Sequence, residues 1–120
     1  MKRINFFALL IISELLLFSS NALPAESGSV NILSPVDGAS LLSTRENKLT
    51  YTLQLGPEGN HLHVYIDDQK PIIVRNVTGC PCSIDLPVLP SGKHVIVVKE
   101  ARSDHSLTGV QSMITVNASN

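Results

Sequence analysis

The sequence predicts an all-β domain, a sandwich of two antiparallel sheets with about seven strands that follows an N-terminal signal peptide. Two observations lead to this prediction. From residue 30 onward, apolar residues recur with a period of two, which is typical of strands with one buried face. Turn residues interrupt the pattern at intervals of roughly 8 to 12 residues, and no segment has the apolar spacing of a capped helix.

The first 22 residues have the three parts of a secretory signal peptide. Lys2 and Arg3 supply positive charge, residues 6–18 form an apolar run, and small residues precede a cleavage site after Ala22, with Ala25 as the alternative. A run of about 13 residues is shorter than the roughly 20 that a membrane-spanning helix requires. We therefore expect a cleaved leader, no membrane span in the mature chain, and a periplasmic or secreted location, where disulfides form.

Removal of this leader leaves enough chain for one domain. We expect a short linker at 23–29, an immunoglobulin-like sandwich at 30–117 and a polar tail at 118–120. The mature chain carries seven basic and nine acidic residues, a net charge of −2 with neutral histidines. Because nucleic-acid binding depends on clustered basic residues, we do not expect a nucleic-acid partner.

Seven segments have the strand pattern. They are residues 30–33, 49–55, 61–66, 71–77, 83–89, 93–99 and 110–116. The first ends at a turn, 34–38, that contains a proline and a glycine. The second alternates apolar and polar residues until the turn 56–60. In the third, the apolar residues share one face, and His61 and His63 share the other face with a tyrosine.

The later segments differ in their expected place in a sheet. Segment 71–77 is short and rich in β-branched residues. Pro87 has no backbone N–H, so segment 83–89 is expected at a sheet edge. Residues 95–98 are apolar on both faces, which predicts a central strand covered on both sides. Segment 110–116 then completes the domain.

Three stretches resemble parts of bacterial immunoglobulin-like domains. Residues 32–39 are similar to their opening strand and turn, and residues 89–97 resemble their penultimate hairpin, in which a glycine turn and a histidine precede a β-branched strand. Residues 64–68 resemble the third strand, except that its usual Asp-Gly turn is Asp67-Asp68 here. The resemblance implies an immunoglobulin-like or fibronectin III-like sandwich and says almost nothing of function.

Four histidines are candidate metal ligands: His61, His63, His94 and His105. They also match a looser group of small exported bacterial proteins of uncharacterised function, which share a His-x-His third strand, a Gly-x-His hairpin and a later histidine. His61 and His63 point to one face with Cα atoms about 6.6 to 7 Å apart. In an immunoglobulin-like topology His94 would lie beside them, and imidazole is a good ligand for copper or zinc.

The alternation of side chains argues against a site that includes all four. If the apolar residues of both strands face the core, His94 faces it as well, whereas His61 and His63 lie on the opposite face. An alternative interpretation is therefore that His61 and His63 are exposed strand residues and that His94 is hydrogen bonded near its turn.

Cys80 and Cys82 are separated only by Pro81. In an oxidising compartment two such thiols tend to form a disulfide, although a one-residue spacer strains its geometry and favours its reduction. A disulfide that locks the loop, a pair that binds a soft metal, and free or intermolecular thiols remain the alternatives. A redox catalyst of the thioredoxin type is disfavoured, because no helix follows to lower the thiol pKa.

No motif typical of an enzyme is present: the sequence lacks a nucleophile elbow, a His-Glu-x-x-His pair and a phosphate-binding glycine loop. We therefore expect a non-catalytic protein, a small exported immunoglobulin-like binding or structural module of the cell envelope. Its partner would be an envelope protein or another surface component. The alternative function is a periplasmic copper- or zinc-binding protein that uses the His61/His63 strand with nearby histidine or cysteine residues.

Overall fold

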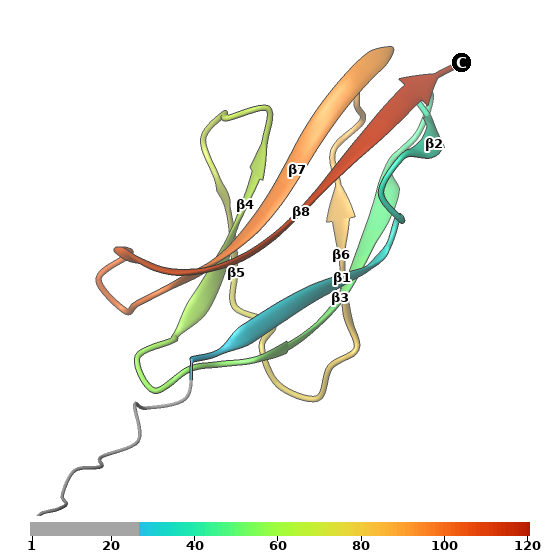
Figure 1. Cartoon of the computed structure of the whole chain (residues 1–120). Helices are drawn as coiled ribbons and strands as arrows, with labels where there is room; N and C mark the ends of the chain where they lie inside the picture. The colour runs from blue at the N-terminus through green and yellow to red at the C-terminus, as the bar shows by residue number, and fades with distance from the viewer. Residues whose placement is uncertain (1–26) are drawn as a thin grey trace, which may run out of the picture.

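The structure, a computed structural model, describes residues 27–120, which form eight strands in two sheets packed face to face (Figure 1). The predicted all-β sandwich is confirmed. The predicted signal peptide and the first part of the predicted linker lie outside the described residues. Within the described range we find no helix long and apolar enough to cross a membrane.

The two sheets have three and five strands. The smaller sheet has the order β1-β3-β6 and contains β1 (Ser29–Ser34), β3 (Asn47–Gln54) and β6 (Cys82–Leu86). The larger sheet has the order β2-β8-β7-β4-β5 and contains β2 (Ala39–Leu42), β8 (Leu107–Ser119), β7 (Gly92–Ala101), β4 (His61–Ile66) and β5 (Ile72–Val74). The strand pairs are antiparallel apart from β2 and β8, which are parallel.

The core lies between the sheets and is built from the apolar face of each strand. Its fully buried large side chains come from the centres of both sheets: Leu49 and Tyr51 of β3, Leu62 and Val64 of β4, Ile96 and Val98 of β7, Leu86 of β6 and Val116 of β8. Full burial of one such aliphatic side chain stabilises the fold by about 1.5–3 kcal/mol. Strand alternation therefore fixes which face of β4 and β7 is turned inward.

The predicted places of two strands in the sheets are confirmed. β6 is an edge strand, and it ends at Leu86, so that Pro87 follows the ladder rather than interrupting it. β7 is central, between β8 and β4, and its residues 94, 96 and 98 are buried on the core face. Its outer face is only half-buried at Val95 and Val97, so the prediction that both faces are covered is wrong. The central strand and the edge strand thus follow from local composition.

Two features differ from the sequence prediction. β2 was not expected; it forms because Gly38 and Asp37 attach the turn to β8, through Gly38 N to Thr115 O at 2.6 Å and Thr115 N to Asp37 Oδ1 at 2.8 Å. β8 also continues to Ser119 instead of ending before a polar tail at 118–120. Ala118 is buried there because it pairs with both neighbouring strands.

The turn that follows β4 shows how Asp67-Asp68 replaces the usual Asp-Gly. Asp67 and Asp68 have φ values of 53° and 61°, and the N–H of Gln69 donates to Ile66 O at 3.1 Å. Two positive φ values in a two-residue turn are typical of type I′, and aspartate tolerates this left-handed conformation better than most residues. Asp67 then also accepts a hydrogen bond from Val95 N at 2.8 Å, which joins the turn to β7.

Candidate metal centre

Three of the four predicted histidine ligands meet in one cluster, formed by His61 and His63 of β4 and His105 of the loop between β7 and β8. The Nε2 atoms of His61 and His63 lie 3.1 Å apart. Nδ1 of His105 lies 3.1 Å from Nε2 of His61 and 3.2 Å from Nε2 of His63. One nitrogen of each ring therefore faces a common point, and we call these three residues the histidine trio.

The trio lies on the outer face of the five-stranded sheet. His61 pairs with Ala101 and His63 with Lys99, and directly paired residues of antiparallel strands point to the same face. Between them Leu62 points into the core. His61 and His63 are nevertheless only 0% and 5% exposed, so the alternative interpretation as exposed strand residues is wrong.

The loop between β7 and β8 returns His105 over β4. Its backbone is closed by hydrogen bonds from Arg102 N to Ser106 O and from His105 N to Arg102 O, both 2.8 Å. His105 itself has a φ of 72°, in the left-handed region that turns the chain sharply. Asp104 accepts from Ser106 N at 2.9 Å, and Arg102 pairs with Glu58 of a neighbouring loop at 2.6 Å. The loop that carries the third ligand is thus held by its own polar contacts.

Hydrogen bonds at the outer ring nitrogens orient two members of the trio. Nδ1 of His61 lies 2.8 Å from the amide oxygen of Asn60, an acceptor, so this nitrogen carries the proton. Nδ1 of His63 lies 3.1 Å from the hydroxyl oxygen of Tyr65, a group that can donate or accept, so this contact orients the ring without fixing its tautomer. In His61, Nε2 is then left with a lone pair directed at the common point. Metal-binding histidines are commonly oriented through such contacts of the second nitrogen.

The environment keeps these two imidazoles neutral. Burial lowers the pKa of His61, and the nearby Arg75 guanidinium lowers it further. Burial also lowers the pKa of His63, with additional effects of His105 and Arg75. Only the neutral ring can bind a metal ion, so His61 and His63 are in their binding form at neutral pH.

His94 does not belong to this cluster. It lies on the core face of β7, about seven residues or roughly 23 Å along the strand from Ala101, the neighbour of His61. Both of its ring nitrogens are engaged, Nδ1 with Asp67 Oδ2 at 2.5 Å and Nε2 with Pro90 O at 2.6 Å. The prediction of His94 as a fourth ligand is therefore wrong, because strand alternation places it on the other side of the sheet.

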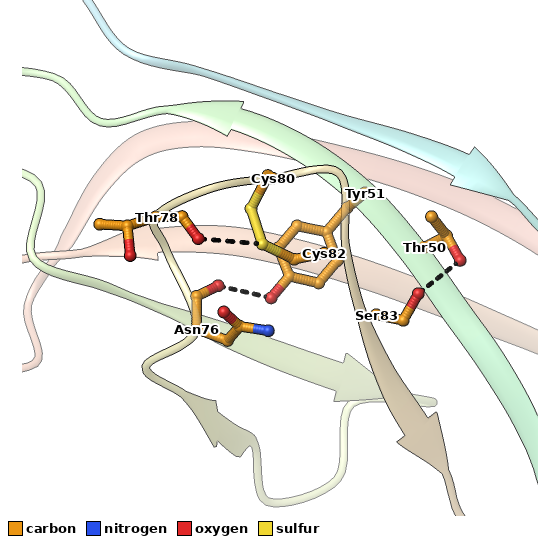
Figure 2. Close-up of a disulfide and its surroundings, with 7 residues drawn as sticks. All are labelled: Thr50, Tyr51, Asn76, Thr78, Cys80, Cys82 and Ser83. Atoms are coloured by element: carbon orange, nitrogen blue, oxygen red, sulfur yellow. Dashed lines mark hydrogen bonds between the residues drawn. A yellow bond between two sulfur atoms is a disulfide. The ribbon is translucent and has the colours of Figure 1, made fainter.

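Cys80 and Cys82 form a disulfide in the loop that crosses from β5 to β6 (Figure 2). Of the alternatives that the spacing left open, the structure has the bridge that closes this loop, and neither sulfur is a thiolate ligand. Beside the bridge, the Tyr51 hydroxyl donates to Asn76 O at 2.6 Å, and Cys82 Sγ lies 3.6 Å from Thr78 O. These contacts attach the crossing loop to the three-stranded sheet.

Comparison with known proteins identifies the fold. No protein-family model matches the chain, and no curated protein sequence matches it. Fibronectin(III)-like modules of CbhA from Clostridium thermocellum superpose with a TM-score of 0.60 at 14% identity, over 74% of this chain and 94% of that one. The fold is that of a fibronectin III-like module.

Two further solved structures are extracellular domains from B. thetaiotaomicron. That of a one-component system superposes with a TM-score of 0.50 at 12% identity, over 82% of this chain and 16% of that one. That of a hybrid two-component system superposes with a TM-score of 0.51 at 10% identity, over 84% of this chain and 16% of that one. At these identities the fibronectin III-like fold is what the chains share.

In this fibronectin III-like sandwich, a buried carboxylate lies on the opposite side of β7 from the trio. Glu100 is 3% exposed, and its two oxygens accept from Gly56 N at 2.8 Å and from the Thr108 hydroxyl at 2.6 Å. It lines a cavity of about 230 Å³ at the end of the sandwich. Sequence reasoning missed this residue, although its even spacing from Ile96 and Val98 places it on the core face.

Sequence reasoning found one of the two residues that orient the histidines. It placed Tyr65 on the face of His61 and His63, as the structure has it, but not the contact of its hydroxyl with His63. Asn60 precedes β4, outside any periodic segment, and no sequence signal marked its contact with His61.

The fibronectin III-like module should contain a histidine with a raised pKa, His94. The Asp67 carboxylate raises the pKa of His94, and the Pro90 carbonyl raises it further, because both stabilise the protonated ring. The stabilising contribution of His94 is thus complete below about pH 6.5, the unfolded value, and is lost as the pH rises through the higher folded pKa. We expect Asp67→Asn, which tolerates the positive φ, to lower the pKa of His94.

Imidazole NMR titrations of the wild-type domain and the Asp67→Asn variant would measure this, with urea unfolding at several pH values as the stability readout. A wild-type His94 that titrates at or below pH 6.5 would contradict the assignment.

Proposed function

We propose that this chain is a non-catalytic fibronectin III-like binding module that works outside the cytoplasm and holds one divalent copper or zinc ion with His61, His63 and His105. The predicted leader supports the location, and so does the disulfide, since disulfides persist in oxidising compartments. The solved structures of similar fold include extracellular domains. A partner among envelope proteins or other surface components stays a prediction from the sequence.

The spacing of the three inward nitrogens is the observation on which the metal proposal rests. With metal–nitrogen bonds of about 2.0–2.1 Å, two ligands of a tetrahedral ion lie about 3.3–3.4 Å apart. The three nitrogen–nitrogen distances of the trio are 3.1, 3.1 and 3.2 Å. The rings would therefore need to separate by only a few tenths of an ångström to bind an ion.

Hydrogen bonding within the trio cannot account for all three contacts. Each of the three inward nitrogens carries either a proton or a lone pair, so at least two of them are alike, and the contact between these two is not a hydrogen bond. A cation at the common point would satisfy all three nitrogens at once.

The donor set selects the class of ion. Three imidazoles suit copper(II) or zinc, whereas both sulfurs of the chain are in the disulfide, so the soft thiolate site considered for Cys80 and Cys82 is not part of the proposal. Cavities of about 230 and 360 Å³ are lined by other residues than the trio. That placement supports a binding role rather than catalysis, since an active site needs a pocket at its reactive group.

Isothermal titration of the mature domain with Zn²⁺ and Cu²⁺ tests the proposal, with a His61→Ala/His63→Ala variant as the comparison. We expect one ion per chain and a loss of binding in the variant, whose fold is checked by circular dichroism. His94→Asn is the matched control and should bind as the wild type does. Affinity weaker than about 10 μM, or equal affinity in the double variant, would refute the metal site.

A further inference from the structure

We propose that the ion bound by the histidine trio takes an anionic oxygen of a carboxylate or phosphate as its fourth ligand, and that Arg75 and Lys99 hold this anion. The inference rests on the proposed metal site and names the class of ligand that the site would accept. The anion would displace a water molecule from the ion, so no covalent bond of the protein changes.

The trio leaves one position of a tetrahedral ion without a protein ligand. Among residues 27–120, no carboxylate, thiolate or further histidine joins the three rings within ligand distance. His105 is exposed, whereas His61 and His63 are buried beneath it. The solvent side of the trio is therefore the side of His105. Three protein ligands with an open fourth position are the arrangement that lets zinc bind an external molecule.

Two cationic side chains flank the trio on the same face of the sheet. Lys99 pairs directly with His63. Its Nζ lies 5.0 Å from the centre of the Tyr65 ring, which contacts the outer nitrogen of His63, so the flexible lysine side chain would turn from this ring toward the ion to meet the anion. Arg75 follows Val74, and the pairing of Val74 with Leu62 places Arg75 at the position that continues the register opposite His61. Lys99, on β7, and Arg75, at the end of β5, thus lie on opposite sides of β4.

The charges around the site favour an anion. A divalent ion held by three neutral rings keeps its full charge, and Arg75 and Lys99 add to it. The acidic groups nearby already have partners: Glu58 pairs with Arg102, and Asp104 accepts from Ser106. Glu100 faces the interior on the other side of the sheet.

Among the described residues, no carboxylate lies within ligand distance of the trio. Guanidinium and ammonium groups bind carboxylate and phosphate oxygens well, and these oxygens are also ligands of zinc.

Visible absorption of the Co²⁺-loaded domain tests the inference, because the spectrum reports the ligands of the ion. We expect the spectrum to change to saturation when acetate or phosphate is added, each titrated separately to distinguish the two sources of anionic oxygen. Arg75→Gln and Lys99→Gln should each weaken anion binding about tenfold, which corresponds to about 1.4 kcal/mol, with the affinity for Co²⁺ unchanged or higher. Arg45→Gln is the matched control, because Arg45 lies beyond β2, at the opposite end of β8 from the trio.

The outcomes separate the two proposals. A domain that does not bind Co²⁺ refutes the metal site itself. A domain that binds Co²⁺ but gives the same spectrum with and without both anions keeps water as the fourth ligand and refutes the inference. Anion binding that is equal in the wild type and in both glutamine variants refutes the roles of Arg75 and Lys99.

Discussion

Zinc at about 100 times its dissociation constant is expected to raise the midpoint of thermal unfolding of the domain by about 10–20 °C. Binding to the native state alone adds about 2.7 kcal/mol to the free energy of unfolding at this concentration. For a domain of this size, each kcal/mol shifts the midpoint by about 4–8 °C. Zinc stabilises only the native state, because the trio joins β4 to a loop some 40 residues later in the chain. The unfolded chain does not bring these residues together.

His105→Asn is the variant that isolates this effect. His105 is exposed and has a φ of 72°, a conformation that asparagine adopts more readily than most residues. We therefore expect the metal-free variant to unfold within about 0.5 kcal/mol of the wild type, while the zinc-induced rise falls to a few degrees. His94→Asn should lower the midpoint of the metal-free domain, but zinc should raise that midpoint by as much as in the wild type.

Scanning calorimetry with zinc and with a chelator measures each midpoint. A wild-type protein whose midpoint does not respond to zinc would exclude the site, and so would an equal rise in all three proteins.

Alternation of side chains made most of the fold predictable, because the core is formed by one face of each strand. It placed Leu62 and Val64 in the interior, and it marked β7 as central through its two apolar faces. β2 was not predictable in this way. Its four residues carry little periodic signal, and its partner, β8, lies more than 70 residues away in the sequence. Strand formation there depends on tertiary pairing and on the contacts of Asp37.

The site was predictable only in part, because side-chain alternation gives the face of a strand residue but not the loop that covers it. The period of two placed His61 and His63 on one face and His94 on the other, as the structure has them. It also suggested that the outward pair is exposed, whereas a loop buries it. That covering depends on the left-handed backbone of His105 and on the register shift between Lys99 and Ala101. Neither of these features has a local sequence signal.

Replacement of Tyr51 by alanine is expected to lower the free energy of unfolding by about 3–5 kcal/mol, the usual effect of removing a large aromatic side chain from a core. The Tyr51 ring is fully buried in the middle of β3, between Ile32 on β1 and Cys82 on β6. Burial raises its pKa, so the hydroxyl stays protonated and donates to Asn76 O (Figure 2). The side chain therefore fills the core and also attaches the crossing loop.

Tyr51→Phe separates these two contributions. The phenyl ring keeps the packing but leaves the Asn76 carbonyl without its donor, so we expect a loss of about 0.5–1.5 kcal/mol in urea unfolding. Asn76 is the neighbour of Arg75, so a freer crossing loop should also weaken anion binding to the metal-loaded domain without reducing its affinity for the metal. If Tyr51→Phe unfolds with the wild-type free energy and binds anions equally well, the hydroxyl does not hold the loop. If Tyr51→Ala loses less than about 1 kcal/mol, the ring is not part of a closely packed core.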